Sequence, residues 1–193
     1  FKGLDRLKQA ARKWASHGHA EKVMSDDLAV IVYTSGTTGN SKGVMLTHGN
    51  LLYDAARAGE IVSAGHEDRF LSILPLAHTY ECSLGLLAPL IHGASVYYLR
   101  ETPTPRILLP AMDRVRPTIV LMVPLIIEKI FKTRILPQLN KNRILRAAYR
   151  IPLIRTRLHR LAGKKLMQSF GGQIKALCIG GAPLAGEAER FLR

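Results

Sequence analysis

The sequence predicts an α/β fold in which a mostly parallel sheet carries helices on both faces, so that the domain has three layers. Short apolar runs that suit strands alternate along the whole chain with longer segments that suit helices. The run over 118–123 is almost entirely apolar, as expected for a strand that is covered on both faces. Pro75, Pro124 and Gly180 follow three of these runs, at the points where the chain is expected to turn into the next helix.

The expected elements fall into two regions, which are residues 1–27 and residues 28–193. The first region holds an amphipathic helix over 4–14 and a polar connector. The second begins with two strands, at 28–34 and 44–47, and the first of them is expected to be buried. The later elements are a helix over 50–64, a strand at 70–74, a helix over 80–92, a strand at 94–99, a helix over 105–116, a strand at 118–123, a helix over 125–131, a strand at 174–179 and a helix from 185.

The helix over 50–64 carries a capping residue and an apolar stripe. Asn50 is expected to cap its first turn, because an Asn side chain can accept a hydrogen bond from a free backbone N–H. The side chains expected to face inward are Leu51, Leu52, Ala55, Ala58 and Val62.

The loop between the strands at 28–34 and 44–47 has the composition of a phosphate-binding loop. Glycine lets backbone N–H groups approach phosphate oxygens, hydroxyls donate further hydrogen bonds and a lysine adds positive charge. It is not a Walker A loop, because Ser41 precedes Lys42 and Gly43 follows it. The alternative is an ordinary surface loop. The expected phosphate ligands are Thr34, Ser35, Gly36, Thr37, Thr38, Gly39 and Lys42.

This loop and its flanks, from Asp26 to Leu51, resemble the phosphate loop of the adenylate-forming (AMP-binding) superfamily. That superfamily includes acyl-CoA synthetases, luciferases and the adenylation domains of peptide synthetases. Many members have Pro where this chain has Ser41. The residue at this position is not itself a phosphate ligand, so the resemblance implies that the loop binds the phosphates of ATP.

Two further segments follow strand ends, where ligands bind in open parallel sheets. Leu74–Glu81 resembles the second signature of the superfamily and would place the catalytic residue His78 beside the acyl carboxylate, although a single His is more often structural. The turn after residue 179 resembles the segment that lines the adenine and acyl pocket, and its alternative is an ordinary βα turn. The expected binding residues in this turn are Gly180, Gly181, Ala182 and Pro183.

The resemblance covers residues 24–193 and is greatest to long-chain fatty acyl-CoA synthetases, because 118–130 and the basic insertion at about 132–168 also match that subgroup. It implies that the parent protein uses ATP and Mg²⁺ to form an acyl-adenylate and passes the acyl group to coenzyme A. The magnesium carboxylate, the ribose-binding Asp and the C-terminal Lys of the superfamily lie in motifs that this chain does not contain. We therefore expect no metal ligand here, a partial AMP-binding domain over 28–193, and no activity of the 193 residues alone.

Several alternatives stay open at this point. The parent protein could be an acyl–acyl carrier protein synthetase or a fatty acyl-AMP ligase, since neither acyl length nor the thiol acceptor can be read from these motifs. A non-catalytic nucleotide-binding domain and a basic membrane-binding module are alternatives of other classes. The absence of Met at position 1 is expected of an internal piece of a longer chain.

The charge of the chain is concentrated in one segment. The formal net charge is +14, and residues 129–186 contain 13 Lys and Arg but no Asp or Glu, which leaves 15 basic and 14 acidic residues elsewhere. Leu and Ile alternate with these cations, a pattern that suits an anionic membrane surface, while a solvated helix face is the alternative. No nucleic-acid-binding module is recognisable, so nucleic acid is the less favoured partner. We expect a cytoplasmic protein with two free thiols, which this segment could hold at the inner face of the membrane.

Overall fold

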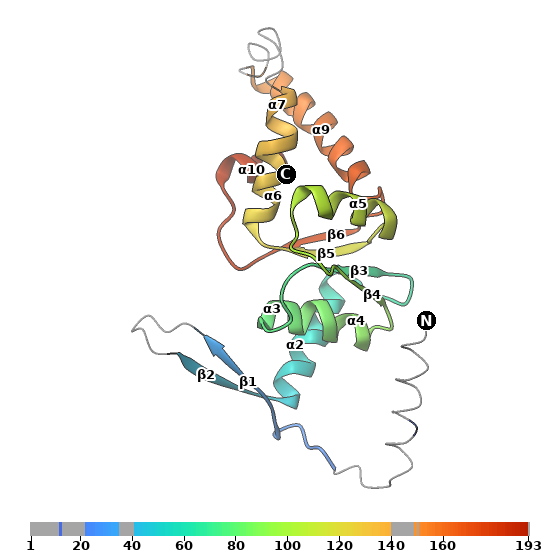
Figure 1. Cartoon of the computed structure of the whole chain (residues 1–193), viewed down its shortest axis with the longest axis vertical. Helices are drawn as coiled ribbons and strands as arrows, with labels where there is room; N and C mark the ends of the chain where they lie inside the picture. The colour runs from blue at the N-terminus through green and yellow to red at the C-terminus, as the bar shows by residue number, and fades with distance from the viewer. Residues whose placement is uncertain (1–11, 13–21, 35–40, 140–148, 150, 193) are drawn as a thin grey trace.

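The centre of the molecule is a four-stranded parallel sheet (Figure 1). The computed structural model describes residue 12 and residues 22–34, 41–139, 149 and 151–192. The strands are β3 (Arg69–Ser72), β4 (Ser95–Tyr98), β5 (Ile119–Met122) and β6 (Ala176–Ile179), in the spatial order β4-β3-β5-β6. All three neighbouring pairs are parallel, which confirms the predicted fold class.

Two apolar layers cover the sheet, one on each face. Successive side chains of a strand point to opposite faces, so β5 contributes Ile119 and Leu121 to one layer and Val120 and Met122 to the other. All four side chains of β5 are buried. The run over 118–123 therefore reads as continuously apolar because both of its faces are covered.

The helices divide between the two faces (Figure 1). One face carries α2 (His48–Ile61), α3 (Thr79–Glu81), the π-helical segment η1 (Cys82–Leu87) and α4 (Ala88–Ile91). The other carries α5 (Pro105–Val115), α6 (Pro124–Ile130), the π-helical segment η2 (Phe131–Ile135), α7 (Leu136–Leu139), α9 (Pro152–Ser169) and α10 (Gly186–Leu192). The described part of the predicted basic insertion is thus helical. Almost all of the helix expected over 4–14 lies outside the described residues.

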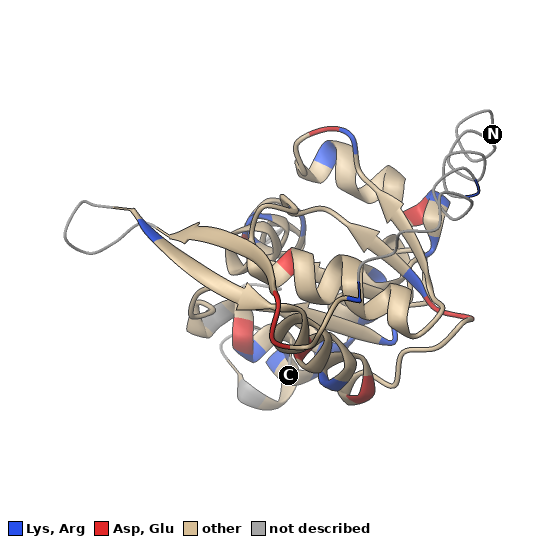
Figure 2. Ribbon diagram, turned by 90° about the horizontal axis from the view of Figure 1, so that it is seen from below, with Lys and Arg blue, Asp and Glu red and all other residues tan. Residues whose placement is uncertain are grey.

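The predicted strand before the phosphate loop forms part of a separate hairpin and is not buried. β1 (Leu28–Thr34) pairs antiparallel with β2 (Lys42–Thr47), and this hairpin reaches out from the parallel sheet (Figure 2). Tyr33 is 73% exposed and Met45 is 69% exposed. The expectation of a buried strand was wrong, because an apolar run alone does not distinguish a central strand from a strand of a projecting hairpin.

The start of α2 also differs from the prediction. Thr47, and not Asn50, is the N-cap, and its Oγ1 accepts a hydrogen bond from the backbone N of Asn50 at 3.2 Å. The Asn50 side chain accepts in return from the backbone N of Thr47 at 3.1 Å, so the two residues form a capping box. Of the residues expected to face inward, Ala55 is fully buried, whereas Leu52 is exposed.

A hydrogen-bonded carboxylate fixes the amino ends of the strands. Asp68 is buried, and its Oδ2 accepts from the backbone N of Gly65 at 2.9 Å and from Lys175 Nζ at 3.1 Å. Lys175 Nζ also donates to the backbone O of Ser63 at 2.5 Å. Burial alone would raise the pKa of Asp68, but the hydrogen bonds from Thr118, Lys175 and Gly65 outweigh it and lower that pKa.

We predict that Asp68→Asn destabilises the fold by about 1.5–3 kcal/mol near neutral pH, the range for hydrogen bonds to a charged group. The pKa of Asp68 is lower in the folded state, so its contribution is present above the unfolded pKa of about 3.9 and disappears as the pH falls through the folded value. Urea titrations at several pH values should show a difference that shrinks toward acid. Glu67→Gln, the same charge change at an exposed neighbour, is the control.

Candidate functional site

The carboxyl ends of the parallel strands border a pocket of about 560 Å³. Leu74 follows β3, Val123 follows β5 and Gly181 follows β6, so three strand ends reach the same cavity. The β1 side of the hairpin closes it from another direction. The lining residues are Val32, Tyr33, Thr34, Leu74, Pro75, His78, Thr79, Tyr80, Glu81, Val123 and Gly181.

His78 lies at this pocket, at the point where the chain enters α3. It is the N-cap residue of that helix, and its backbone O accepts from the backbone N of Cys82 at 2.9 Å. Its own backbone N donates to Pro75 O at 3.0 Å. His78 is exposed and lines the pocket, and its side chain makes no capping hydrogen bond. These backbone contacts fix the main chain of His78 and leave its ring available to a ligand.

The turn after β6 depends on two glycines for different reasons. Gly181 has a φ of +88°, a conformation that residues with a Cβ rarely adopt, and it lines the pocket. A Cβ on Gly180 would lie 3.0 Å from the Tyr80 ring, so a side chain at this position would press on the ring and force it to shift by a few tenths of an ångström. Ala182 and Pro183, the other two predicted binding residues, are exposed and do not line the pocket.

The ends of the predicted phosphate loop lie at the tip of the β1–β2 hairpin. Thr34 and Lys42 are register partners, and Thr34 Oγ1 donates to the backbone O of Lys42 at 3.5 Å. Thr34 lines the pocket, whereas Lys42 does not. The predicted ligands Ser35, Gly36, Thr37, Thr38 and Gly39 lie outside the described residues.

Tyr80 and Glu81 also line the pocket, and neither was predicted as a site residue, although both lie in the Leu74–Glu81 segment. Burial, and to a lesser extent the neighbouring Cys178 and Glu81, raise the pKa of Tyr80 to about 12, so the phenol stays neutral. Burial also raises the pKa of Glu81, an effect that the Ser72 hydroxyl partly offsets. The available signal was a Glu directly before an apolar helical segment, where a charged side chain is uncommon.

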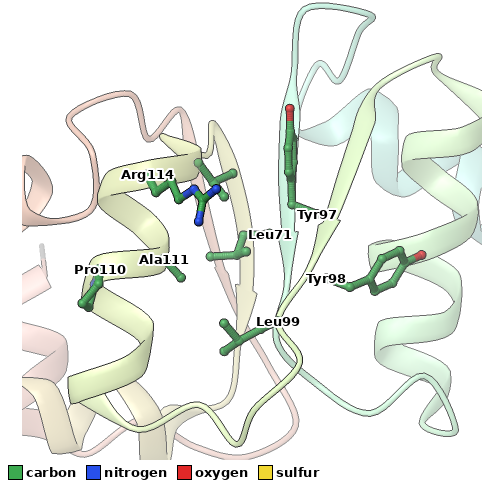
Figure 3. A pocket seen from close by; sticks show the side chains of 8 residues that line it. Leu71, Tyr97, Tyr98, Leu99, Pro110, Ala111 and Arg114 are labelled. Carbon is green, nitrogen blue, oxygen red and sulfur yellow. The ribbon is translucent and has the colours of Figure 1, made fainter. Parts of the chain in front are cut away.

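A second pocket of about 540 Å³ lies between α5 and the edge strand β4 (Figure 3). Figure 3 shows the Arg114 side chain reaching from α5 toward Leu71, whereas the Tyr98 ring points to the other side of the sheet. None of the residues predicted for the site lines this pocket. The pocket at the strand ends is therefore the candidate functional site. Within the described ranges, no group of three His, Cys, Asp or Glu side chains could hold a metal ion.

Comparison with known proteins identifies the family. The sequence pattern described as "AMP-binding enzyme" matches residues 2–193. The chain belongs to the AMP-binding enzyme family. The resemblance inferred from the sequence is thereby confirmed. The pocket at the strand ends is lined by residues of the Leu74–Glu81 segment, by Gly181 of the turn after β6, and by Thr34 at the edge of the predicted phosphate loop.

Relatives within the AMP-binding family include acyl-CoA ligases. The chain is 35% identical over 186 residues to long-chain-fatty-acid–CoA ligase 1 of Cavia porcellus, covering 87% of this chain and 26% of that protein. It is 40% identical over 113 residues to the chloroplastic long-chain-fatty-acid–[acyl-carrier-protein] ligase AEE15 of Arabidopsis thaliana, covering 55% of this chain and 14% of that protein. The chain thus spans about a quarter of the length of the acyl-CoA ligase.

Solved structures of the family share the fold. ATP-bound MatB from Rhodopseudomonas palustris superimposes with a TM-score of 0.64 at 24% identity, covering 93% of this chain and 30% of that one. The inhibitor-bound N-terminal domain of FACL13 from Mycobacterium tuberculosis gives a TM-score of 0.62 at 20% identity, covering 90% of this chain and 35% of that one. At these identities the likeness shows that the two chains share this fold.

We predict that Gly180→Ala destabilises the protein by about 1–3 kcal/mol, because its new methyl group would press on the Tyr80 ring. Adding Tyr80→Ala should remove most of the extra cost, so the double-mutant cycle should give a clear coupling energy in urea unfolding. Gly163→Ala in α9 is the control of opposite sign, because no atom lies within 4 Å of its new Cβ and Ala favours helix by up to about 1 kcal/mol. Equal effects of Gly180→Ala with and without Tyr80 would contradict the contact.

Proposed function

We propose that the full-length protein is an ATP-dependent acid–thiol ligase that activates a long-chain fatty acid and transfers it to coenzyme A. The observation that carries the proposal is that Thr34, His78 and Gly181, from the three predicted signatures, line one pocket at the strand ends. In the first step a carboxylate oxygen would attack the α-phosphorus of ATP, giving acyl-adenylate and releasing pyrophosphate. In the second, the thiol of coenzyme A would attack the acyl carbonyl and AMP would leave.

The residues of this chain would act mainly by binding and orientation. The hydroxyl of Thr34 and the backbone around Gly181 are suited to donate hydrogen bonds to phosphate or nucleotide groups. His78 would flank the reacting carboxylate and orient it. Mg²⁺ would neutralise charge on the phosphates when bound.

A small apolar cavity supports an acyl substrate. It has a volume of about 150 Å³ and lies between α2, η1 and the sheet. Tyr80 packs in the same apolar cluster as Leu84 and Cys178, two residues that line this cavity, and it also lines the polar pocket. A cavity of this size accepts roughly a benzene-sized group, so it would hold only a part of a long acyl chain.

The thiol acceptor of the second step has more than one candidate. The relative AEE15 is named as an acyl-carrier-protein ligase, so the same pocket is compatible with a carrier protein in place of coenzyme A. A fatty acyl-AMP ligase would stop after the first step, and a non-catalytic nucleotide-binding domain would bind ATP without either step. Exchange of labelled pyrophosphate into ATP with a fatty acid tests the first step, and product analysis with each acceptor tests the second. ATP binding without exchange would contradict the ligase.

We predict that Lys42→Ala in the full-length protein weakens adenylation at least about 10-fold, the size of one charge-assisted contact. Lys42 is the one cation in the sequence of residues 33–44 and is the first residue of β2, next to the predicted phosphate ligands. Pyrophosphate exchange at saturating fatty acid is the measurement. Lys129→Ala, an exposed lysine on α6 outside the pocket lining, should leave the rate unchanged. An unaltered rate in Lys42→Ala would remove this residue from the site.

We also propose that the basic segment holds the protein at an anionic membrane surface, which implies a cytoplasmic protein at the inner face of that membrane. α9 carries exposed Arg157, Arg160 and Lys164 together with Leu153 and Leu161, which are 70% and 67% exposed. Cations interleaved with apolar side chains suit an interfacial helix. No described helix combines the length and the apolar character that crossing a bilayer requires. A soluble carboxylic acid would not need this surface, whereas a fatty acid partitions into lipid.

We predict that replacing Arg157, Arg160 and Lys164 together by Gln weakens binding to phosphatidylglycerol vesicles by roughly a hundredfold, at about 1 kcal/mol for each cation. Binding of the parent protein to these vesicles should fall steeply as the salt concentration rises, because the attraction is screened within about 10 Å at about 0.1 M salt. Vesicle co-sedimentation is the measurement. Replacing the exposed Arg100, Arg106 and Arg114 by Gln makes the same charge change outside α9. Equal losses in both triple variants would contradict a specific role of α9, and a preference for duplex DNA over vesicles would favour nucleic acid.

A further inference from the structure

Glu81 is a buried carboxyl group that accepts no hydrogen bond from any described residue. Its side chain is 0% exposed, and neither Oε1 nor Oε2 has a partner among the residues that the structure describes. An isolated carboxylate in such a place is very costly, because nothing replaces the water that it loses. Buried polar groups in native proteins are nearly always paired, so this exception asks for an explanation.

The local chain conformation makes room for this group. A Cβ on Gly85 would lie 2.4 Å from Glu81 Oε1, so no other residue could stand there without moving the carboxyl. Gly85 belongs to η1, and π-helical turns within helices occur frequently at functional sites. Glu81 and Gly85 are four residues apart and form a matched pair, in which a missing side chain accommodates the buried acid.

No described residue supplies a positive charge to Glu81. The Ser72 hydroxyl, at the end of β3, is close enough to offset part of the rise in the pKa of Glu81, but it makes no hydrogen bond of acceptable geometry to either carboxyl oxygen. The other hydroxyls near Glu81 are those of Tyr80 and of Tyr98, at the end of β4. Burial, and to a lesser extent Glu81, raise the pKa of Tyr98, and burial, Cys178 and Glu81 together raise that of Tyr80, so both phenols remain neutral. Burial also raises the pKa of Cys178, on β6, which favours the neutral thiol.

The other described elements that pack on η1 also bring no charged side chain to Glu81. On α2 the charged residues are Asp54, Arg57 and Glu60, all exposed, and Arg57 Nη1 pairs with Glu60 Oε2 at 2.8 Å. At the end of α4, His92 Nε2 lies 3.3 Å from the backbone O of Ala56, with which it can hydrogen bond. β5 contributes only apolar side chains. Among the described residues that surround it, Glu81 therefore faces only neutral groups.

We propose that Glu81 is a positioning residue that works as an uncharged carboxylic acid, holding His78 and Tyr80 at the pocket, and that loss of its proton displaces this segment. The inference rests on the proposed adenylation activity. Glu81 ends the single turn of α3, whose N-cap is His78, and it directly follows Tyr80, whose ring rests on Gly180. A charge that leaves the buried site to reach water would pull the turn with it. A carboxylic acid kept neutral by an apolar site has a known use in catalysis as a hydrogen-bond donor.

If loss of the Glu81 proton displaces this segment, binding of the fatty acid should depend on pH. Burial raises the pKa of Glu81, so the group is protonated at low pH and ionises as the pH rises through its folded-state value. The KM for the fatty acid should therefore rise at alkaline pH, with a smaller change in kcat. A residue with a purely structural role would lower stability without moving this profile.

The test compares three variants of the full-length protein. Glu81→Gln keeps the shape and cannot ionise, so it should hold the KM low and remove its alkaline rise. Glu81→Ala empties the site and should raise the KM about tenfold or more at every pH. Glu101→Gln, the same change at an exposed glutamate, should reproduce the wild-type profile. The readout is KM and kcat for pyrophosphate exchange with a soluble fatty acid across neutral and alkaline pH.

A second readout does not depend on activity. The infrared carbonyl band of a protonated carboxylic acid should be present in the wild-type protein near neutral pH and absent in Glu81→Gln. Loss of that band together with an unchanged alkaline rise in Glu81→Gln would overturn the positioning role. No band in the wild-type protein would show that Glu81 is ionised and would also overturn it. A band without any pyrophosphate exchange by the wild-type protein would instead contradict the proposed function.

Discussion

The architecture depends on the burial of β5 on both faces. Every side chain of this strand is buried, and alternate residues enter two different apolar clusters, so β5 is stable only where a helical layer covers each side of the sheet. The parallel order β4-β3-β5-β6 places it between two partners and brings the carboxyl ends of three strands to one edge. The pocket follows from this constraint, because Leu74, Val123 and Gly181 are the residues that leave those ends.

The sequence predicted the elements of the sheet but not the neighbours of each strand. The strands expected at 70–74, 94–99, 118–123 and 174–179 all exist, since each combines an apolar run with a turn signal. Apolar periodicity reports burial and says nothing about pairing, so the order of strands could not be read from it. The same limit explains the error at 28–34. That run is as apolar as a central strand, yet its pairing with β2 places it in an exposed hairpin.

The candidate site was predicted by resemblance and completed by packing. His78 and the Gly180–Gly181 turn were singled out because they follow strand ends and match the family signatures. Tyr80 and Glu81 were missed because their roles arise from contacts that are distant in sequence. Tyr80 lies against Gly180, which is distant from it in the sequence. Burial, and after it the Glu81 carboxyl, raise the pKa of Tyr98 on the edge strand. A motif records which residues occur together, whereas such contacts exist only once the sheet has formed.

Two buried carboxyl groups mark the opposite ends of the sheet, and their surroundings differ in a way that separates stability from function. Asp68, at the amino ends, accepts hydrogen bonds from Gly65 and Lys175, so its charge is stabilised and its pKa is lowered. Glu81, at the carboxyl ends, has no such partner in the part of the chain that the structure describes, and burial raises its pKa. A fold that needed only rigidity would gain from satisfying both groups. Because the unsatisfied carboxyl is the one beside the pocket, its cost is best explained by a role there, where unfavourable local arrangements are retained for binding and catalysis.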